Sequence, residues 1–133
     1  MSEKAKVYFA DFRADWRESL PKKLARLLRT AGFDTIGMDG KYVAIKMHFG
    51  EPGNLAYLRP QWARVVVDMV RERGGKPFLT DCNTLYGGGR KNALDHLESA
   101  YQNGFTPYVT GCHILIGDGL KGNDEVEVPV EGG

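Results

Sequence analysis

The sequence is poor in cysteine and has no long apolar run. Its 133 residues contain two cysteines, Cys82 and Cys112, which do not form a CxxC pair. A disulfide framework, a zinc ribbon or an iron–sulfur motif within the chain is therefore not expected. No segment approaches the ~20 apolar residues of a membrane-spanning helix, and the N-terminus lacks the apolar run of a signal peptide. These absences predict a cytoplasmic protein with reduced thiols and no membrane partner.

A surplus of charge is also missing. Eighteen basic residues nearly balance seventeen acidic ones, which gives a net charge of +1. Nucleic-acid-binding proteins usually carry a basic surplus or a dense basic stripe. The densest basic group here alternates with leucines along an amphipathic helix, which is typical of a solvated face; it consists of Lys22, Lys23, Arg26 and Arg29. Nucleic acid is therefore not an expected partner.

What is present is an alternation of strand and helix patterns. Predicted strands are Lys6–Phe12, Tyr42–His48, Lys76–Asp81 and His113–Gly117, and the alternating segment Glu125–Val130 is expected to be an edge strand. Predicted helices run from a cap at Ser19 to about Ala31, from Pro60 to Gly74-Gly75, and over about Asn92–Asn103. This order predicts an α/β fold: a mostly parallel sheet of about four to five strands, helices on both faces, and an antiparallel edge strand as an option at the C-terminus.

The chain is short enough to be one domain, so we expect a single α/β domain over residues 1–133. Its acidic end, DEVEVPVEGG, stops without a helix to cover it. Either the last strand is an exposed edge or the sequence is the N-terminal fragment of a longer protein, and we favour the fragment.

Polar residues gather where the predicted strands end, which is where ligands bind in open α/β sheets. In the segment after the second strand, Lys46 and His48 point to the same face because side chains alternate. Lys46 could hold a phosphate or carboxylate, while His48 and Glu51 could ligate a metal or move a proton. The alternative is that Lys46 reaches solvent and His48 bonds only to backbone.

The third predicted strand runs into a second polar segment. Asp81, Asn83 and Tyr86 are followed by three glycines and Arg90, a loop that could bring backbone N–H groups to an anion. The loop matches neither GxxxxGK[ST] nor GxGxxG, and it could also be a flexible turn capped by Asn92. For Cys82 a structural role is favoured over a nucleophile, and His96 and His113 are likewise interpreted as structural.

Asp118 ends the fourth predicted strand as Asp81 ends the third. Two carboxylates at strand ends can share a cation or divide acid and base roles between them. Aspartates flanked by glycine are also ordinary turn residues.

Four motifs together resemble one protein family, the domain of unknown function 362. They are KMHFGEPGN (46–54), LTDCNTLY (79–86), NALDH (92–96) and DGLKGN (118–123). Members of that family are typically longer, and many continue into a ferredoxin-like segment with two [4Fe–4S] clusters. The resemblance therefore implies a redox-linked parent protein whose clusters lie outside this chain. The family often has Thr where this chain has Cys82, which weakens a nucleophile role, and it implies no established catalytic residue.

The sequence thus predicts a ligand-binding or catalytic domain of an iron–sulfur-associated protein. Its partners would be an anionic small molecule, with a divalent metal as an option, and its own ferredoxin-like segment or another redox partner. The predicted catalytic residues are Lys46, His48 and Asp81; the ligand-binding residues are Asn54, Asn83, Tyr86 and Arg90; and the metal ligands are Glu51 and Asp118.

The alternative function is a docking module without catalysis. It predicts an exposed apolar patch, for which the candidate aromatics are Phe49, Tyr57, Trp62 and Tyr86. A nucleotide-cofactor enzyme would suit the fold class but lacks the expected glycine spacing.

Overall fold

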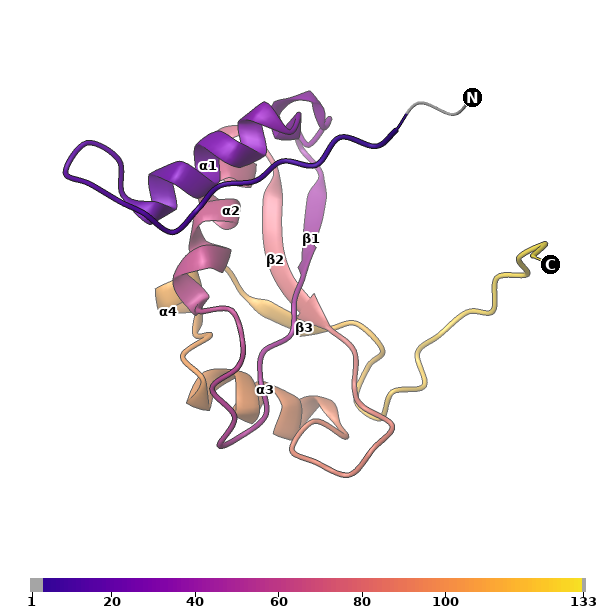
Figure 1. Ribbon diagram of the computed structural model, residues 1–133. Helices are drawn as coiled ribbons and strands as arrows, with labels where there is room; N and C mark the ends of the chain where they lie inside the picture. The colour runs from indigo at the N-terminus through magenta and orange to yellow at the C-terminus, as the bar shows by residue number, and fades with distance from the viewer. Residues whose placement is uncertain (1–3, 133) are drawn as a thin grey trace.

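The computed structural model describes residues 4–132, which form a parallel sheet with helices (Figure 1). The strands are β1 (Tyr42–Lys46), β2 (Lys76–Asp81) and β3 (Ile114–Ile116), and they lie side by side in the order β1-β2-β3 with both pairs parallel. The helices are α1 (Leu20–Thr30), α2 (Pro60–Glu72), α3 (Ala93–Gln102) and the short α4 (Pro107–Thr110), with a 3-10 turn η1 (Phe33–Thr35). The α/β fold is confirmed, but the described residues form three strands rather than four to five.

The residues at the N-terminal ends of the three longer helices explain where these helices begin. Ser19 and Asn92 are the N-caps of α1 and α3, and Pro60 opens α2. The amide oxygen of Asn92 accepts hydrogen bonds from the backbone N–H groups of Leu94 and Asp95, which have no partner within the helix itself. The predicted helix boundaries are therefore confirmed to within a residue or two. The sequence reasoning missed α4.

The core lies on one face of the sheet. Ile45, Leu79 and Ile114 are aligned across the three strands, and α2 and α3 pack against them. Leu79, in the central strand, is fully buried. The buried cluster consists of Phe49, Ala63, Val67, Leu79, Ala100, Phe105, Cys112 and Ile114.

The other face of the sheet is exposed. We name it the open sheet face and define it by Tyr42, Ala44, Lys76, Phe78, His113 and Leu115, which alternate with the core-facing positions. Tyr42 is 78% and Leu115 56% exposed. The prediction placed helices on both faces, whereas α2 and α3 pack on one face, and α1 and α4 contact α2.

The two outermost predicted strands do not form. Residues 6–12 and 125–130 contain no strand, and their apolar side chains are exposed, with Val7 at 90% and Val126 at 87%. Both predictions were wrong for the same reason. Alternating apolar residues favour an extended backbone, but a strand also needs a neighbour to hydrogen-bond with.

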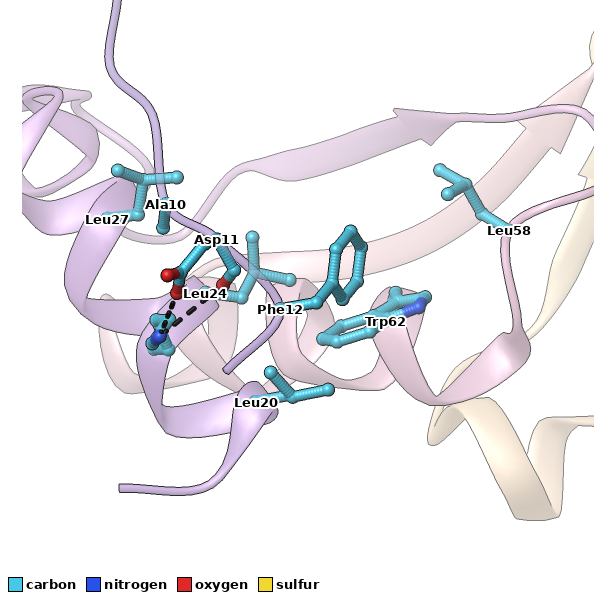
Figure 2. Close-up of a pocket in the computed structure, with 9 residues that line it drawn as sticks. Ala10, Asp11, Phe12, Leu20, Leu24, Leu27, Leu58 and Trp62 are labelled. Carbon is cyan, nitrogen blue, oxygen red and sulfur yellow. Dashed lines mark hydrogen bonds and ion pairs between the residues drawn. The ribbon is translucent and has the colours of Figure 1, made fainter. Parts of the chain in front are cut away.

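The N-terminal segment lies along α1 instead. Lys23 of that helix binds the Asp11 carboxylate at 2.8 Å, and the ring of Phe12 meets Trp62 edge-on at 6.3 Å between centroids. Between the segment and the leucines of α1 lies an apolar hollow of about 230 Å³ (Figure 2).

None of the helices between residues 4 and 132 is long and apolar enough to cross a membrane.

Candidate functional site

Asp81, the last residue of β2, is the centre of a group of charged side chains. Its carboxylate is 8% exposed and lies 3.1 Å from Lys46 Nζ, 3.5 Å from Arg90 Nη1 and 3.6 Å from His96 Nε2. It also accepts a hydrogen bond of 3.0 Å from the backbone N–H of Cys82. These contacts join the end of β1, the loop after β2 and α3. We name the group the Asp81 cluster and define it as Lys46, Glu51, Asp81, Tyr86, Arg90 and His96.

Arg90 ties two loops together from a buried position. Its side chain is 2% exposed; Nε donates to Glu51 Oε1 at 2.6 Å and Nη2 donates to Tyr86 Oη at 2.6 Å. The second oxygen of Glu51 accepts from the backbone N–H of Gly89 at 3.2 Å. The planar guanidinium can make these contacts and the one to Asp81 at once, which an ammonium group could not do with the same geometry. The loop after β1 is thereby fixed to the loop after β2.

Both carboxylates of the cluster are ionised at neutral pH. Burial alone would raise the pKa of Asp81, but His96, Lys46 and the N–H of Cys82 outweigh it and lower that pKa to about 2. Burial likewise opposes the ionisation of Glu51, yet Arg90 and the N–H of Gly89 hold the Glu51 pKa below its usual range. A carboxylate with a pKa of about 2 accepts protons poorly near pH 7. Asp81 therefore suits an electrostatic role better than proton transfer.

His96 is a member of the cluster that sequence reasoning left out. It is fully buried, with its ring edge-on to Phe49 at 5.8 Å between centroids. Its Nε2 contact to Asp81, at 3.6 Å, is electrostatic rather than a hydrogen bond, and neither ring nitrogen has a hydrogen-bond partner within residues 4–132. Helical spacing from Ala93 and Ala100 suggested a structural role. The available signal was the motif NALDH (92–96), which ends in His96.

Asn83 and Asp118 form a second polar group. The backbone N–H of Asn83 donates to both carboxylate oxygens of Asp118 at 3.0 Å, and its side-chain amide donates to Asp118 Oδ1 at 3.1 Å and to the carbonyl of Gly119 at 2.9 Å. The loops after β2 and β3 are thus joined. The Asn83 amide oxygen is buried and accepts no hydrogen bond from the described part of the chain.

Two further predicted residues make local contacts. His48 Nδ1 accepts from the backbone N–H of Gly50 at 2.9 Å, so the neutral ring carries its proton on Nε2. Asn54 accepts from the N–H of Ala56 at 2.8 Å within the same loop. The His48 contact matches the backbone-bonding alternative, although the ring is also exposed to solvent.

The two predicted metal ligands lie in different groups. Each Glu51 oxygen accepts from the Arg90 side chain or the Gly89 backbone, and both Asp118 oxygens accept from Asn83. Across residues 4–132 no three His, Cys, Asp or Glu side chains gather as a set that could hold a metal ion. The divalent metal therefore stays a prediction from the sequence, and we derive no chemistry from it.

The aromatic residues suggested for a docking patch are mostly inside the protein. Phe49 is fully buried and Tyr57 and Trp62 are partly buried, while Tyr86 is 57% exposed. They do not together form an exposed surface.

Comparisons with known proteins identify a family. Neither the curated proteins nor the solved structures contain a match to this chain. A family model described as a domain of unknown function (DUF362) matches residues 43–133, which include β1 except its first residue, β2, β3, the Asp81 cluster and the Asn83–Asp118 group. That match covers more than half of the sequence, and the chain therefore belongs to the DUF362 family.

Proposed function

We propose that this domain binds a small anionic molecule at the carboxyl ends of β1 and β2, as a ligand-binding or catalytic domain. The observation that carries the proposal is the position of Lys46. Its side chain is 67% exposed, yet its ammonium lies 3.1 Å from the carboxylate of Asp81, which is 8% exposed. The Asp81 cluster thus holds a solvent-accessible cation at the edge of the sheet where ligands of open α/β folds bind.

The charge balance of the cluster limits what it can bind. Lys46 and Arg90 carry two positive charges, and Asp81 and Glu51 carry two negative ones, so the cluster has no net attraction for an anion. An anion would bind by drawing the Lys46 ammonium away from Asp81, which would keep its contacts with buried Arg90 and with the backbone N–H of Cys82. One flexible ammonium suits a single phosphate or carboxylate group rather than a polymer.

His48 would supply proton transfer if the domain is catalytic. It follows Lys46 by two positions, and its exposed ring can donate a hydrogen bond to a ligand from Nε2. To take up a proton, Nδ1 would first have to release the backbone N–H of Gly50. Asp81 would stay ionised and hold the position of Lys46.

The test is a titration of the ¹⁵N-labelled chain with inorganic phosphate and then with citrate, followed by amide chemical shifts. We expect shifts in residues 46–51 and 81–90, and we expect Lys46→Gln to abolish them. Lys22→Gln is the matched control, because Lys22 is an exposed lysine on α1. Unchanged spectra at millimolar ligand, or equal shifts in the Lys46→Gln variant, would show that the proposal is wrong.

We further propose that the parent protein is iron–sulfur-associated, and this rests on the family resemblance alone. The chain's own cysteines do not fit a cluster, because Cys112 is buried in the core and Cys82 is exposed. A two-cluster ferredoxin titrated onto the labelled chain should shift a contiguous set of amides if such a segment is a partner. Spectra that do not change would argue against this association.

A further inference from the structure

The open sheet face contains a hollow that is both apolar and positively charged. Parallel sheets are normally covered on both faces, so an exposed face of this kind is unusual. The hollow has a volume of about 530 Å³, and no carboxylate lines it. Its main lining residues are Tyr42, Arg71, Lys76, Phe78, His113 and Leu115.

Two cationic side chains, Arg71 and Lys76, line this hollow, and none of its lining residues is a carboxylate that could pair with them. Lys76 Nζ lies 5.2 Å from the centre of the Tyr42 ring, and Arg71 donates to the backbone carbonyl of Gly111. A cation–π contact and a carbonyl hydrogen bond orient these groups but leave their charge unneutralised. A segment that fits the hollow should therefore be apolar and acidic.

The chain contains one segment with that chemistry, at its own C-terminal end. We name residues 124–131 the acidic tail: it carries Asp124 and three glutamates, with no lysine or arginine. Its valines alternate with the glutamates and are 72–87% exposed. In Figure 1 the acidic tail, drawn in yellow, extends away from the sheet.

We propose that the open sheet face binds the acidic tail of a second copy of this chain. The valines would cover Phe78 and Leu115, and the glutamates would neutralise Arg71 and Lys76. An exchange of tails in both directions would make a closed two-fold dimer, which buries both unpartnered surfaces in each copy. Eight extended residues reach about 26 Å, enough to cross a three-stranded sheet.

In one copy the acidic tail begins at the opposite end of the sheet from the hollow. The hollow lies at the amino ends of the strands, where Tyr42, Lys76 and His113 are found. The tail leaves from the opposite, carboxyl end, because it follows β3. The Asp124 N–H also bonds to the carbonyl of Asp118 at 3.1 Å, in the loop that Asn83 holds in place.

Sedimentation of the full chain over a wide concentration range tests the proposal. We expect the mass to rise toward the dimer with concentration. Lys76→Glu alone and Glu127→Lys alone should each weaken association about fivefold or more, since each replaces an attraction by a repulsion. The variant that carries both changes should recover association, because the charges are then exchanged. Lys22→Glu and Glu98→Lys, at exposed positions on α1 and α3, are the matched controls.

Several results would overturn the proposal. A chain that stays monomeric up to millimolar concentration excludes it, as does a dimer that both charge reversals leave unchanged. Tail amide shifts that do not depend on concentration would show docking within one copy instead. Amide spectra of each variant establish that it is folded, so lost association cannot be confused with unfolding. Phosphate binding near Lys46 is measured separately, and either result can stand without the other.

Discussion

At the scale of single residues, Arg90 is the most buried charged side chain among residues 4–132. It balances Glu51 and Asp81 while almost completely excluded from water. Removing one partner of a buried ion pair typically costs about 3–5 kcal/mol, because the remaining charge is left uncompensated. We expect Arg90→Met to lower the free energy of unfolding by this amount in urea titrations.

Arg13→Met is the control for that measurement, since Arg13 is 93% exposed beside Asp11. Its effect should stay within about 0.5 kcal/mol. A loss below about 1 kcal/mol in Arg90→Met would mean that the two carboxylates find other partners or water, and that Arg90 does not hold the cluster together.

The lowered pKa of Asp81 predicts how the free energy of unfolding depends on pH. Its pKa is about 2 in the folded protein against 3.8 for an ordinary aspartate, so the folded state favours the ionised form. The contribution is therefore fully present above about pH 4 and is lost as pH falls toward 2. A difference of nearly two pKa units corresponds to about 2 kcal/mol. Glu51, whose pKa is also lowered, adds to the loss in the same direction.

Unfolding free energies at pH 5 and pH 2.5 should therefore differ less in Asp81→Asn than in the unchanged chain. Asp68→Asn, which alters a half-exposed aspartate paired with Arg64 on α2, should keep the full pH dependence. Equal pH dependence in all three proteins would rule out Asp81 as the source.

At the scale of elements, the two helix caps allow a graded prediction. The Asn92 side chain accepts two hydrogen bonds, of 3.1 and 3.0 Å, whereas Ser19 accepts one of 3.5 Å. Asn92→Ala should cost about 1 kcal/mol and Ser19→Ala about half of that or less. Hydrogen exchange should show the loss of protection in α3 for the first variant and in α1 for the second. A larger effect at Ser19 would mean that hydrogen bonding does not set the strength of these caps.

The same scale explains what could be predicted from the sequence. The bounds of β2 and the caps of α1 and α3 depend on neighbours in the chain, and they were predicted correctly. Residues 6–12 and 125–130 have equally good alternation but no adjacent strand. The alternation within a segment does not indicate whether another strand lies beside it to form hydrogen bonds. For the candidate site, we expected Lys46, Asp81 and Arg90 to lie close together, because the carboxyl ends of parallel strands meet at one edge of the sheet. Lys46 and Arg90 do lie beside Asp81. His96 was missed because its approach to Asp81 depends on how α3 packs.

At the scale of the whole molecule, the protein has a one-sided core, and this carries the last prediction. Leu79 and Leu115 lie on adjacent strands but on opposite faces of the sheet, with Leu79 fully buried and Leu115 56% exposed. Leu79→Ala should cost about 2–5 kcal/mol, because it opens a cavity against α2 and α3. Leu115→Ala should change the stability of the dilute chain by less than about 1 kcal/mol.

Urea titrations at low micromolar concentration measure the stability of both variants without association. Sedimentation at high concentration measures whether Leu115 also contributes to the dimer. If the acidic tail of another copy covers the open sheet face, Leu115→Ala weakens the dimer while barely changing the monomer. A large loss of stability in dilute Leu115→Ala would instead mean that something within the same chain already covers this face. That result would contradict both the one-sided core and the exchange of tails.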